Sequence, residues 1–273
     1  MDNRCIGVFD SGLGGLTCVK EIISLLPNEN IVYFGDTGRV PYGTRSAETI
    51  IKYTESDIRF LMQFDPKIII IACGTASTTA LEVVRKKFDV NIMGVVDPSA
   101  TAAALATKNG RIGVIGTSRS INSGKYEEAL KAINSQFEVF SNACPLFVPL
   151  VENGYLEKKA TYLIAEEYLA PIINAGVDTI ILGCTHYPLI SKVIGDIAGE
   201  GVTLIDPGKE TARNIRSTLE AGEIYPSEGT PVHRFYISDK VETFTEMAEM
   251  FLQQKITGKV EKIDIEKYMT MEG

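Results

Sequence analysis

Short apolar runs alternate with amphipathic segments of helical length along almost the whole chain. Runs of this kind, bounded by small or turn-forming residues, are typical of parallel strands that are buried on both faces of a sheet. Parallel strands need long crossover connections, so the alternation predicts βαβ units and an α/β fold with doubly wound parallel sheets. Residues 46–63 and 155–173 are expected to be helices. The expected strands are residues 5–9, 31–34, 67–72, 92–96, 111–115, 177–182 and 202–205.

A weak internal repeat divides the chain into two halves. Residues 6–12 resemble residues 112–118, and an Asp-Pro pair occurs at 97–98 and again at 206–207. Each half also has one strand that ends in a cysteine, so two similar α/β domains are expected. The last part of the chain has no counterpart in the repeat and is expected to return to the first domain. The expected domains are residues 1–97 plus 208–273, and residues 98–207.

Composition narrows the class of protein. Of the 273 residues, 45% are hydrophobic and 23% are charged, as in average globular proteins. No apolar run approaches the roughly 20 residues that span a bilayer, so no membrane insertion is expected. The first residues lack the features of a signal peptide, which predicts a cytoplasmic protein. A net charge of −8 disfavours nonspecific attraction to nucleic acid.

Five cysteines form an odd set without a C-x-x-C pair, so neither a disulfide framework nor a structural zinc site is expected. Cys5, Cys18 and Cys144 are interpreted as small buried hydrophobic residues. Cys73 and Cys184 differ because each ends a strand and precedes a hydroxyl-rich turn. Ligands collect at the carboxyl edge of such sheets, and a helix amino terminus lowers the pKa of a thiol. A structural role and a role as a base both remain open for these two residues.

Three other segments carry polar residues at expected strand ends. His186 lies two positions after Cys184 and could hold it as a thiolate or protonate it. Asp10 begins a glycine-rich loop that lacks the G-x-G-x-x-G spacing, and it is expected either to meet a cationic ligand group or to cap the next helix. Residues 35–43, with Asp36, form a turn-rich loop that could offer backbone amides. Glu152 is by default a solvated acid.

Taken together, these segments resemble the glutamate racemases of the aspartate/glutamate racemase family. The resemblance spans nearly the whole chain, and the order of the motifs makes it specific. The residues that carry it are 9–17 (FDSGLGGLT), 33–37 (YFGDT), 39–43 (RVPYG), 72–73 (AC), 75–76 (TA), 149–152 (PLVE) and 182–189 (LGCTHYPL).

The resemblance implies that glutamate binds in a cleft between two α/β domains. Cys73 and Cys184 would face its α-carbon from opposite sides, with Cys73 taking the proton from D-glutamate and Cys184 taking it from L-glutamate. Asp10 would assist Cys73, and Glu152 and His186 would assist Cys184. Asp36 and Thr117 are possible supporting residues. The implied substrate-binding residues are Asp10, Ser11, Pro41, Tyr42, Gly43, Gly74, Thr75, Thr185 and His186.

The same resemblance implies an isomerase that works without pyridoxal phosphate or any other cofactor and without a metal. Its product, D-glutamate, would serve peptidoglycan synthesis, and with it cell-wall biogenesis and cell shape. Members of the family are commonly homodimers. Two opposed bases suit this chemistry, because an acid on the face opposite a base inverts the centre, whereas one base alone only exchanges the proton.

Gly74 departs from the family pattern, which usually has Asn after the first cysteine. Ser120 stands where the family often has Thr. Gly74 leaves two alternatives to glutamate racemisation: the chain could racemise another acidic amino acid such as aspartate, or be an inactive amino-acid-binding or regulatory relative. A cysteine hydrolase that uses Cys184 and His186 is a third alternative, but it leaves Cys73 without a role.

Overall fold

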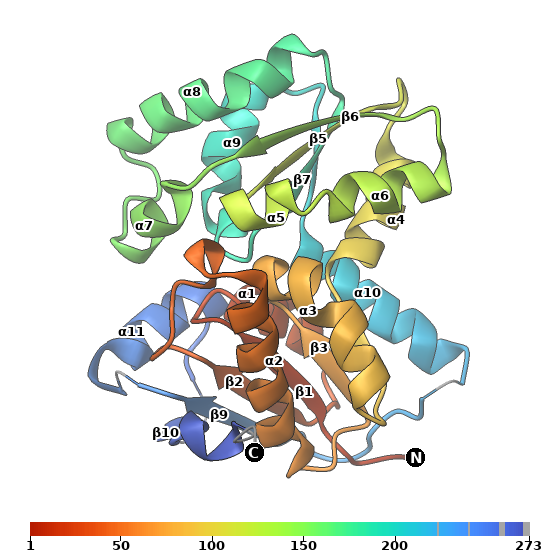
Figure 1. The fold of residues 1–273 in the computed structure, drawn as a ribbon, viewed down its shortest axis with the longest axis vertical. Coiled ribbons are helices and arrows are strands. Elements are labelled where there is room, and N and C mark those ends of the chain that lie inside the picture. The colour runs from red at the N-terminus through yellow and green to blue at the C-terminus, as the bar shows by residue number, and fades with distance from the viewer. Residues whose placement is uncertain (223, 240, 257–259, 270–273) are drawn as a thin grey trace.

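The computed structural model describes residues 1–222, 224–239, 241–256 and 260–269. The molecule contains two parallel sheets, each flanked by its own helices. The two sheets lie one above the other along the long axis of the molecule (Figure 1). The first sheet has the strand order β10-β9-β2-β1-β3-β4, and the second has the order β6-β5-β7-β8. The strands of the first sheet are β1 (Ile6–Asp10), β2 (Ile31–Gly35), β3 (Ile68–Ile71), β4 (Ile92–Gly94), β9 (His233–Ile237) and β10 (Val260–Lys262). Those of the second are β5 (Arg111–Gly116), β6 (Glu138–Ala143), β7 (Thr179–Gly183) and β8 (Thr203–Ile205).

Helices connect the strands in the alternation that the sequence predicts. The α-helices are α1 (Leu16–Leu25), α2 (Ala47–Met62), α3 (Gly74–Lys87), α4 (Val96–Ala106), α5 (Ser118–Asn122), α6 (Lys125–Ile133), α7 (Phe147–Glu152), α8 (Lys159–Asn174), α9 (Ser191–Ala198), α10 (Pro207–Glu220) and α11 (Val241–Leu252). The short 3-10 helices are η1 (Tyr42–Thr44), η2 (Tyr187–Ile190) and η3 (Ile265–Tyr268). No helix in these ranges is long and apolar enough to cross a membrane.

The two sheets repeat one topology, which explains the internal repeat of the sequence. The order β2-β1-β3-β4 in the first sheet corresponds to β6-β5-β7-β8 in the second. Each cysteine strand, β3 or β7, therefore lies beside the strand that opens its half, β1 or β5. The predicted fold class, two similar doubly wound parallel sheets, is confirmed.

Some boundaries differ from the prediction. The strand expected at residues 92–96 ends at Gly94, because the Val95 N–H donates to Ser77 Oγ and α4 begins at Val96. Strand β6 was not predicted. It lies at the edge of its sheet, and none of its side chains is fully buried, so its sequence lacks the continuous apolar run of a central strand.

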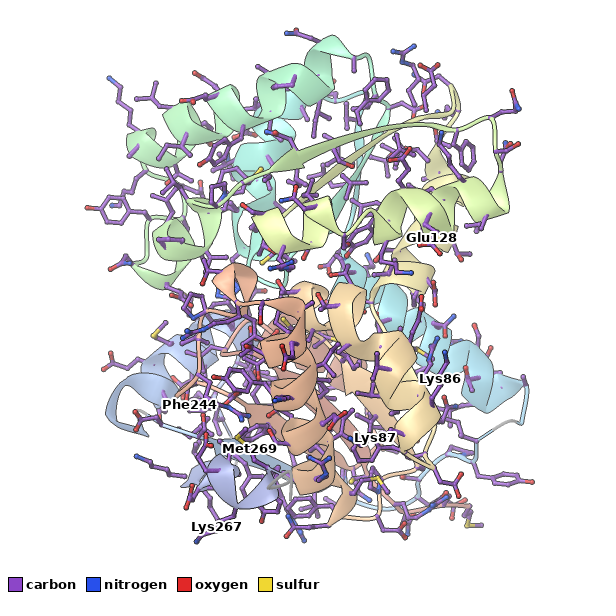
Figure 2. All side chains as sticks on the ribbon, viewed as in Figure 1. Lys86, Lys87, Glu128, Phe244, Lys267 and Met269 are labelled. Atoms are coloured by element: carbon purple, nitrogen blue, oxygen red, sulfur yellow. The ribbon has the colours of Figure 1, made fainter. Side chains whose placement is uncertain are left out.

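Strand burial explains why the central strands form. All four residues of β3 and all five of β7 are buried between helical layers, as continuous apolar runs in parallel sheets require. Side chains fill the layers between sheets and helices, and Phe244 of α11 is one of the buried ones (Figure 2).

Strands β9 and β10 join the first sheet, so the chain returns to it after the second sheet. This pairing supports the expected division into residues 1–97 plus 208–273 and residues 98–207, whose limits remain a prediction. Within the first of these domains, residues 223, 240, 257–259 and 270–273 lie outside the described part.

Candidate active site

A cavity of about 390 Å³ lies where the carboxyl ends of strands from both sheets meet. Its wall is built from residues that follow β1, β2 and β3 in the first sheet and β5, β6 and β7 in the second. Parallel sheets place ligand sites at this edge, because the connections after the strands gather there. The predicted residues on the wall are Ser11, Pro41, Tyr42, Gly43, Cys73, Gly74, Thr75, Thr117, Glu152, Cys184, Thr185 and His186.

Cys73 lies two residues after the end of β3 and is the N-cap of α3, where its Sγ accepts from the Ala76 N–H at 3.5 Å. The thiol donates to Ser11 Oγ at 3.4 Å. A helix amino terminus favours a thiolate, but burial and the charge of Asp10 outweigh it and raise the pKa of Cys73 to about 12. Without substrate, Cys73 is therefore a neutral thiol.

Cys184 directly follows β7 and faces a histidine. Its Sγ lies 3.9 Å from His186 Nδ1, and His186 Nε2 lies 3.1 Å from Glu152 Oε1. Glu152 is the last residue of α7, so a turn of the second domain completes a thiol, imidazole and carboxylate series. Sequence reasoning from residues alone did not single out Glu152; the family resemblance did.

His186 carries a positive charge at neutral pH. Burial lowers its pKa, but hydrogen bonds and charge interactions with Cys184 and Glu152 act more strongly and raise the pKa to about 10. The Phe251 ring packs against the imidazole in a T-shaped arrangement, with ring centroids 5.1 Å apart. A cation therefore adjoins Cys184, whereas an anion lies near Cys73.

Asp10 ends β1 and is only 1% exposed. Its Oδ2 accepts from the Gly12 N–H at 2.8 Å, and its Oδ1 accepts from Thr185 Oγ1 at 3.3 Å. The carboxylate thus binds a backbone N–H and a hydroxyl next to the turn that leads into α1, whose N-cap is Gly15. Burial raises the pKa of Asp10, while the charge of His186 opposes the shift.

Hydroxyl groups from both domains meet beside Cys73. Thr75 Oγ1 lies 3.0 Å from Thr117 Oγ1, which lies 3.0 Å from Ser120 Oγ. Thr117 is the N-cap of α5, so this group joins α3 of the first sheet's layer to α5 of the second. The wall here offers hydroxyls that can reorient to donate to a ligand.

The loop after β2 supplies Pro41, Tyr42 and Gly43 to the wall. The side chain of Tyr42 points away from the cavity, because it is 1% exposed and its hydroxyl bonds Asp36 at 2.5 Å. The part of Tyr42 that is available to a ligand in the cavity is therefore its backbone. Asp36 is buried and binds the loop from behind. Its partner Asp57 was missed, although an acid at the buried face of an amphipathic helix, seven residues after Ile50, is a recognisable signal.

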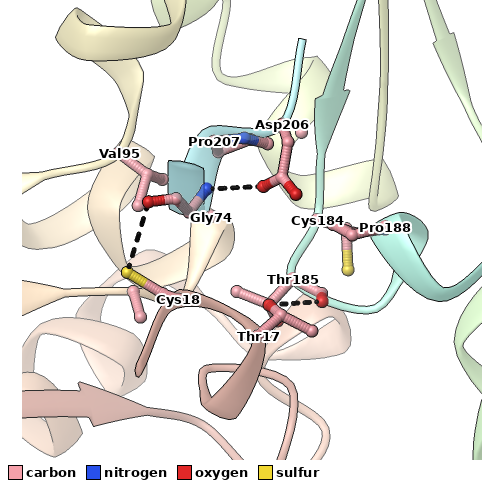
Figure 3. A pocket seen from close by; sticks show the side chains of 12 residues that line it. Thr17, Cys18, Gly74, Val95, Cys184, Thr185, Pro188, Asp206 and Pro207 are labelled. Atoms are coloured by element: carbon pink, nitrogen blue, oxygen red, sulfur yellow. Dashed lines mark hydrogen bonds between the residues drawn. The ribbon is translucent and has the colours of Figure 1, made fainter. Parts of the chain in front are cut away.

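Gly74 brings the two domains into backbone contact. A Cβ added at this position would lie 2.5 Å from the carbonyl oxygen of Gly183, the residue before Cys184. An asparagine, as in the family pattern, would require the backbone to shift. Behind this contact is a small internal cavity of about 10 Å³ (Figure 3). There Thr17 Oγ1 donates to the Thr185 carbonyl at 3.0 Å and ties the Cys184 turn to α1.

Further wall residues were missed by sequence analysis. Cys144 is fully buried, as predicted, but it also lines the cavity. Pro145, Val148 and Pro149 form an apolar side of the wall next to it. Pro149 belongs to the 149–152 motif of the family resemblance, but no sequence pattern marks Pro145 or Val148, whose positions depend on the unpredicted strand β6. Among the residues that the structure describes, no group of three or more His, Cys, Asp or Glu side chains is arranged to hold a metal ion.

Comparison with known proteins identifies the family. The family model described as Asp/Glu/Hydantoin racemase matches residues 6–215. The chain belongs to this family. Within it, a glutamate racemase of Geobacter metallireducens is 46% identical over 264 residues, covering 96% of this chain and 97% of the relative. The resemblance that the motifs indicated, and the expectation of a racemase enzyme, are therefore confirmed.

Solved structures agree with this assignment. Glutamate racemase isoform RacE1 from Bacillus anthracis superimposes with a TM-score of 0.93 at 39% identity, covering 97% of this chain and 98% of that one. The glutamate racemase of Francisella tularensis in complex with D-glutamate has a TM-score of 0.91 at 39% identity, covering 98% of this chain and 100% of that one. The two-sheet architecture is thus that of solved family members.

Proposed function

We propose that this enzyme interconverts L-glutamate and D-glutamate through two opposed cysteine bases. The observation that carries the proposal is that Cys73 and Cys184, from separate sheets, lie on the wall of one cavity at equivalent strand ends. The high identity to glutamate racemases over nearly the whole chain supports glutamate as the substrate.

In the proposed reaction, the thiolate of Cys184 takes the α-proton of L-glutamate. The thiol of Cys73 gives its proton to the opposite face, which leaves Cys73 as the thiolate and Cys184 as the thiol. The reverse sequence converts D-glutamate, so the two cysteines exchange roles in each direction.

The surroundings of each thiol suit the start of the L-to-D direction. Positively charged His186 stabilises a Cys184 thiolate, and Glu152 holds the imidazole. Cys73 begins protonated because of burial and Asp10. The ammonium group of bound glutamate would offset the charge of Asp10 and ease ionisation of Cys73 for the D-to-L direction.

Loss of the α-proton places negative charge on the substrate carboxylate. Hydroxyls of Thr75, Thr117 and Thr185, together with backbone amides of the glycine-rich turns, are the proposed donors for this charge. Donors fixed before the reaction and shielded from water stabilise such charge far more than solvent does. In this role, Gly74 contributes its backbone and not a side-chain amide.

The biological setting follows from the same family resemblance. We propose that the product supplies peptidoglycan synthesis, that the protein acts in the cytoplasm and that it forms a homodimer. The reaction as proposed uses no cofactor and no metal.

Proton NMR of L-glutamate and, separately, D-glutamate with the enzyme in deuterated buffer, without added pyridoxal phosphate, tests the proposal. We expect loss of the α-proton signal together with inversion from both enantiomers. Folded protein that does neither with glutamate would overturn it. Inversion of aspartate would then identify another acidic amino acid as substrate, a covalent acyl-enzyme would indicate a hydrolase, and binding without exchange would indicate a regulatory relative.

A further inference from the structure

The loop between β2 and α2 forms one side of the cavity, but the side chains of Asp36 and Arg39 are not part of the cavity wall. Residues 40–44 of this loop line the wall. On the other side of the loop, the Tyr42 hydroxyl lies 2.5 Å from Asp36 Oδ2 and 3.0 Å from Asp57 Oδ2. Asp36 follows β2 and Asp57 lies on α2, so the phenol joins the loop to two separate elements.

Arg39 completes this cluster. Its Nε donates to Asp36 Oδ2 at 2.7 Å, and its Nη2 donates to Asp57 Oδ1 at 2.6 Å. Its Nη1 donates to Ser56 Oγ at 3.0 Å, and its guanidinium lies 4.3 Å above the Tyr53 ring. We call Asp36, Arg39, Tyr42 and Asp57 the Arg39 clamp.

The charges of the clamp are buried and mutually dependent. Arg39 is 8% exposed, and Asp36 and Asp57 are fully buried. The phenol has one proton, which can serve only one of the two carboxylates. Burial and the charge of Asp36 raise the pKa of Asp57, so that a proton on Asp57 can serve the second contact. Removing one member takes a hydrogen-bond partner from buried charged groups, which is more unfavourable than losing a partner in a surface ion pair.

The front of the loop meets the second domain. A Cβ added to Gly43 would contact Thr117 Cβ at 3.4 Å, and the Arg45 carbonyl accepts from Arg119 Nη2 at 2.7 Å. Thr117 and Arg119 belong to the α5 segment, which also bears on the cavity. The loop is therefore held from behind by the clamp while its front lies between the two domains.

We infer that the Arg39 clamp positions this loop for substrate binding, so that the backbone of Tyr42 and Gly43 is fixed against glutamate before it enters. Arg39 does not line the cavity, so it acts through the loop as a positioning residue. The inference rests on the proposed function and adds residues to it. Buried polar networks hold one arrangement where apolar packing would permit several. A loop that is already ordered lowers the entropy cost of substrate binding.

Tyr42→Phe is the sharpest test, because it keeps the ring and removes only the hydroxyl. We expect KM for glutamate to rise about tenfold in both directions while kcat changes less than about threefold, since the thiols are untouched. Tyr53→Phe is the matched control. Only the ring of Tyr53 contacts the neighbouring Tyr42 ring and Arg39, so KM should stay at the parent value.

Arg39→Met and Arg39→Lys extend the test. Lysine keeps the charge without the planar fork, so Arg39→Lys should recover part of the KM that Arg39→Met loses. Thermal unfolding of each variant separates positioning from folding. A lowered unfolding temperature with KM unchanged in the folded variants would overturn the inference, as would a fall in kcat alone.

Failure of the parent enzyme to racemise glutamate would instead overturn the proposed function. In that case calorimetric binding of D-glutamate still decides the question of the clamp. Weaker binding to Tyr42→Phe than to Tyr53→Phe supports the inference, and equal binding to both contradicts it.

Discussion

The ends of β3 and β7 occupy equivalent places in two sheets of the same topology, and each carries one cysteine. Their surroundings differ in charge. Cys73 lies among hydroxyls and near Asp10, and its pKa is raised to about 12. Cys184 lies 3.9 Å from His186, whose own pKa is raised to about 10. Equivalent backbone positions therefore need not give equivalent chemistry.

A repeated fold can therefore supply symmetric positions while the neighbouring side chains give each position its own electrostatic surroundings. A racemase needs one base and one acid on opposite faces at any moment. A cation beside Cys184 and an anion near Cys73 give the two positions different electrostatic surroundings. Substitutions at and around Cys73 and Cys184 test how far the two positions differ.

The largest expected effect is loss of either thiol. Cys73→Ser and Cys184→Ser should each lower the racemisation rate at least about a thousandfold, because a hydroxyl is a far weaker acid than a thiol at neutral pH. Chiral analysis of both enantiomers measures this. Cys5→Ser is the control, since Cys5 lies outside the cavity and contacts the Phe64 carbonyl. A Cys73 or Cys184 variant that racemises near the parent rate would contradict the two-base mechanism.

His186→Asn should remove the positive charge that distinguishes the surroundings of Cys184 from those of Cys73. We expect about a tenfold to hundredfold fall in rate, because the Cys184 thiolate loses its cationic neighbour. The two enantiomers have equal free energies, so kcat/KM must fall equally in both directions, and the asymmetry appears in isotope effects. The effect of α-deuteration should grow more for L-glutamate than for D-glutamate. Equal growth for both would show that His186 serves the two thiols alike.

The pH dependence of the unfolding free energy tests the charge of His186 independently of activity, and the expected effect is smaller. The pKa of His186 rises from 6.5 to about 10 on folding, so its stabilisation is complete below pH 6.5 and is lost as the pH rises towards 10. The difference in unfolding free energy between parent and His186→Asn should shrink over that range, by at most about 1.4 kcal/mol per pH unit. Chemical denaturation at several pH values tests this.

His233 provides the opposite sign and serves as the control. Burial lowers its pKa below 6.5, so its contribution to stability is lost as the pH falls. The difference in unfolding free energy between the parent and His233→Asn should therefore stay constant from pH 7 to 10. If the difference in unfolding free energy between the parent and His186→Asn were also constant over this pH range, the His186 imidazole would be neutral in the folded protein.

Ser11→Ala should have the smallest effect. It removes one hydroxyl that accepts from Cys73 at 3.4 Å, a single weak bond, so we expect a roughly twofold to tenfold fall in rate. Steady-state kinetics in both directions measures it. A fall as large as that of Cys73→Ser would place Ser11 in the proton transfer itself.

Much of the fold could be predicted because periodicity and burial act locally. The runs that became β3 and β7 are continuous and apolar, and a central parallel strand needs that pattern. Strand β6 escaped because an edge strand with part of each face in solvent has no such run. Its counterpart β2 was predicted, since β2 lies inside the larger sheet with β9 on its other side.

The site could be predicted only in part. Cys73, Cys184 and His186 follow strands, so the sequence places them at the sheet edge. Glu152 lies at the end of α7 and not at a strand end, and its contact with His186 depends on where α7 is placed. Tyr42 was expected at the substrate, but only the folded loop shows that its hydroxyl turns to Asp36 and Asp57.

The sequence by itself determined the α/β class, the two halves and the two cysteine strand ends, because these follow from chain-local patterns and from motifs in a fixed order. The fold adds most of the electrostatics around the thiols. Burial and the charge of Asp10, 63 positions away along the chain, raise the pKa of Cys73, and the raised pKa of His186 depends on its neighbour Cys184 and on Glu152, 34 positions away. Interactions between charges depend on the distance between them and strengthen with burial. Neither distance nor burial can be read from the order of the residues along the chain.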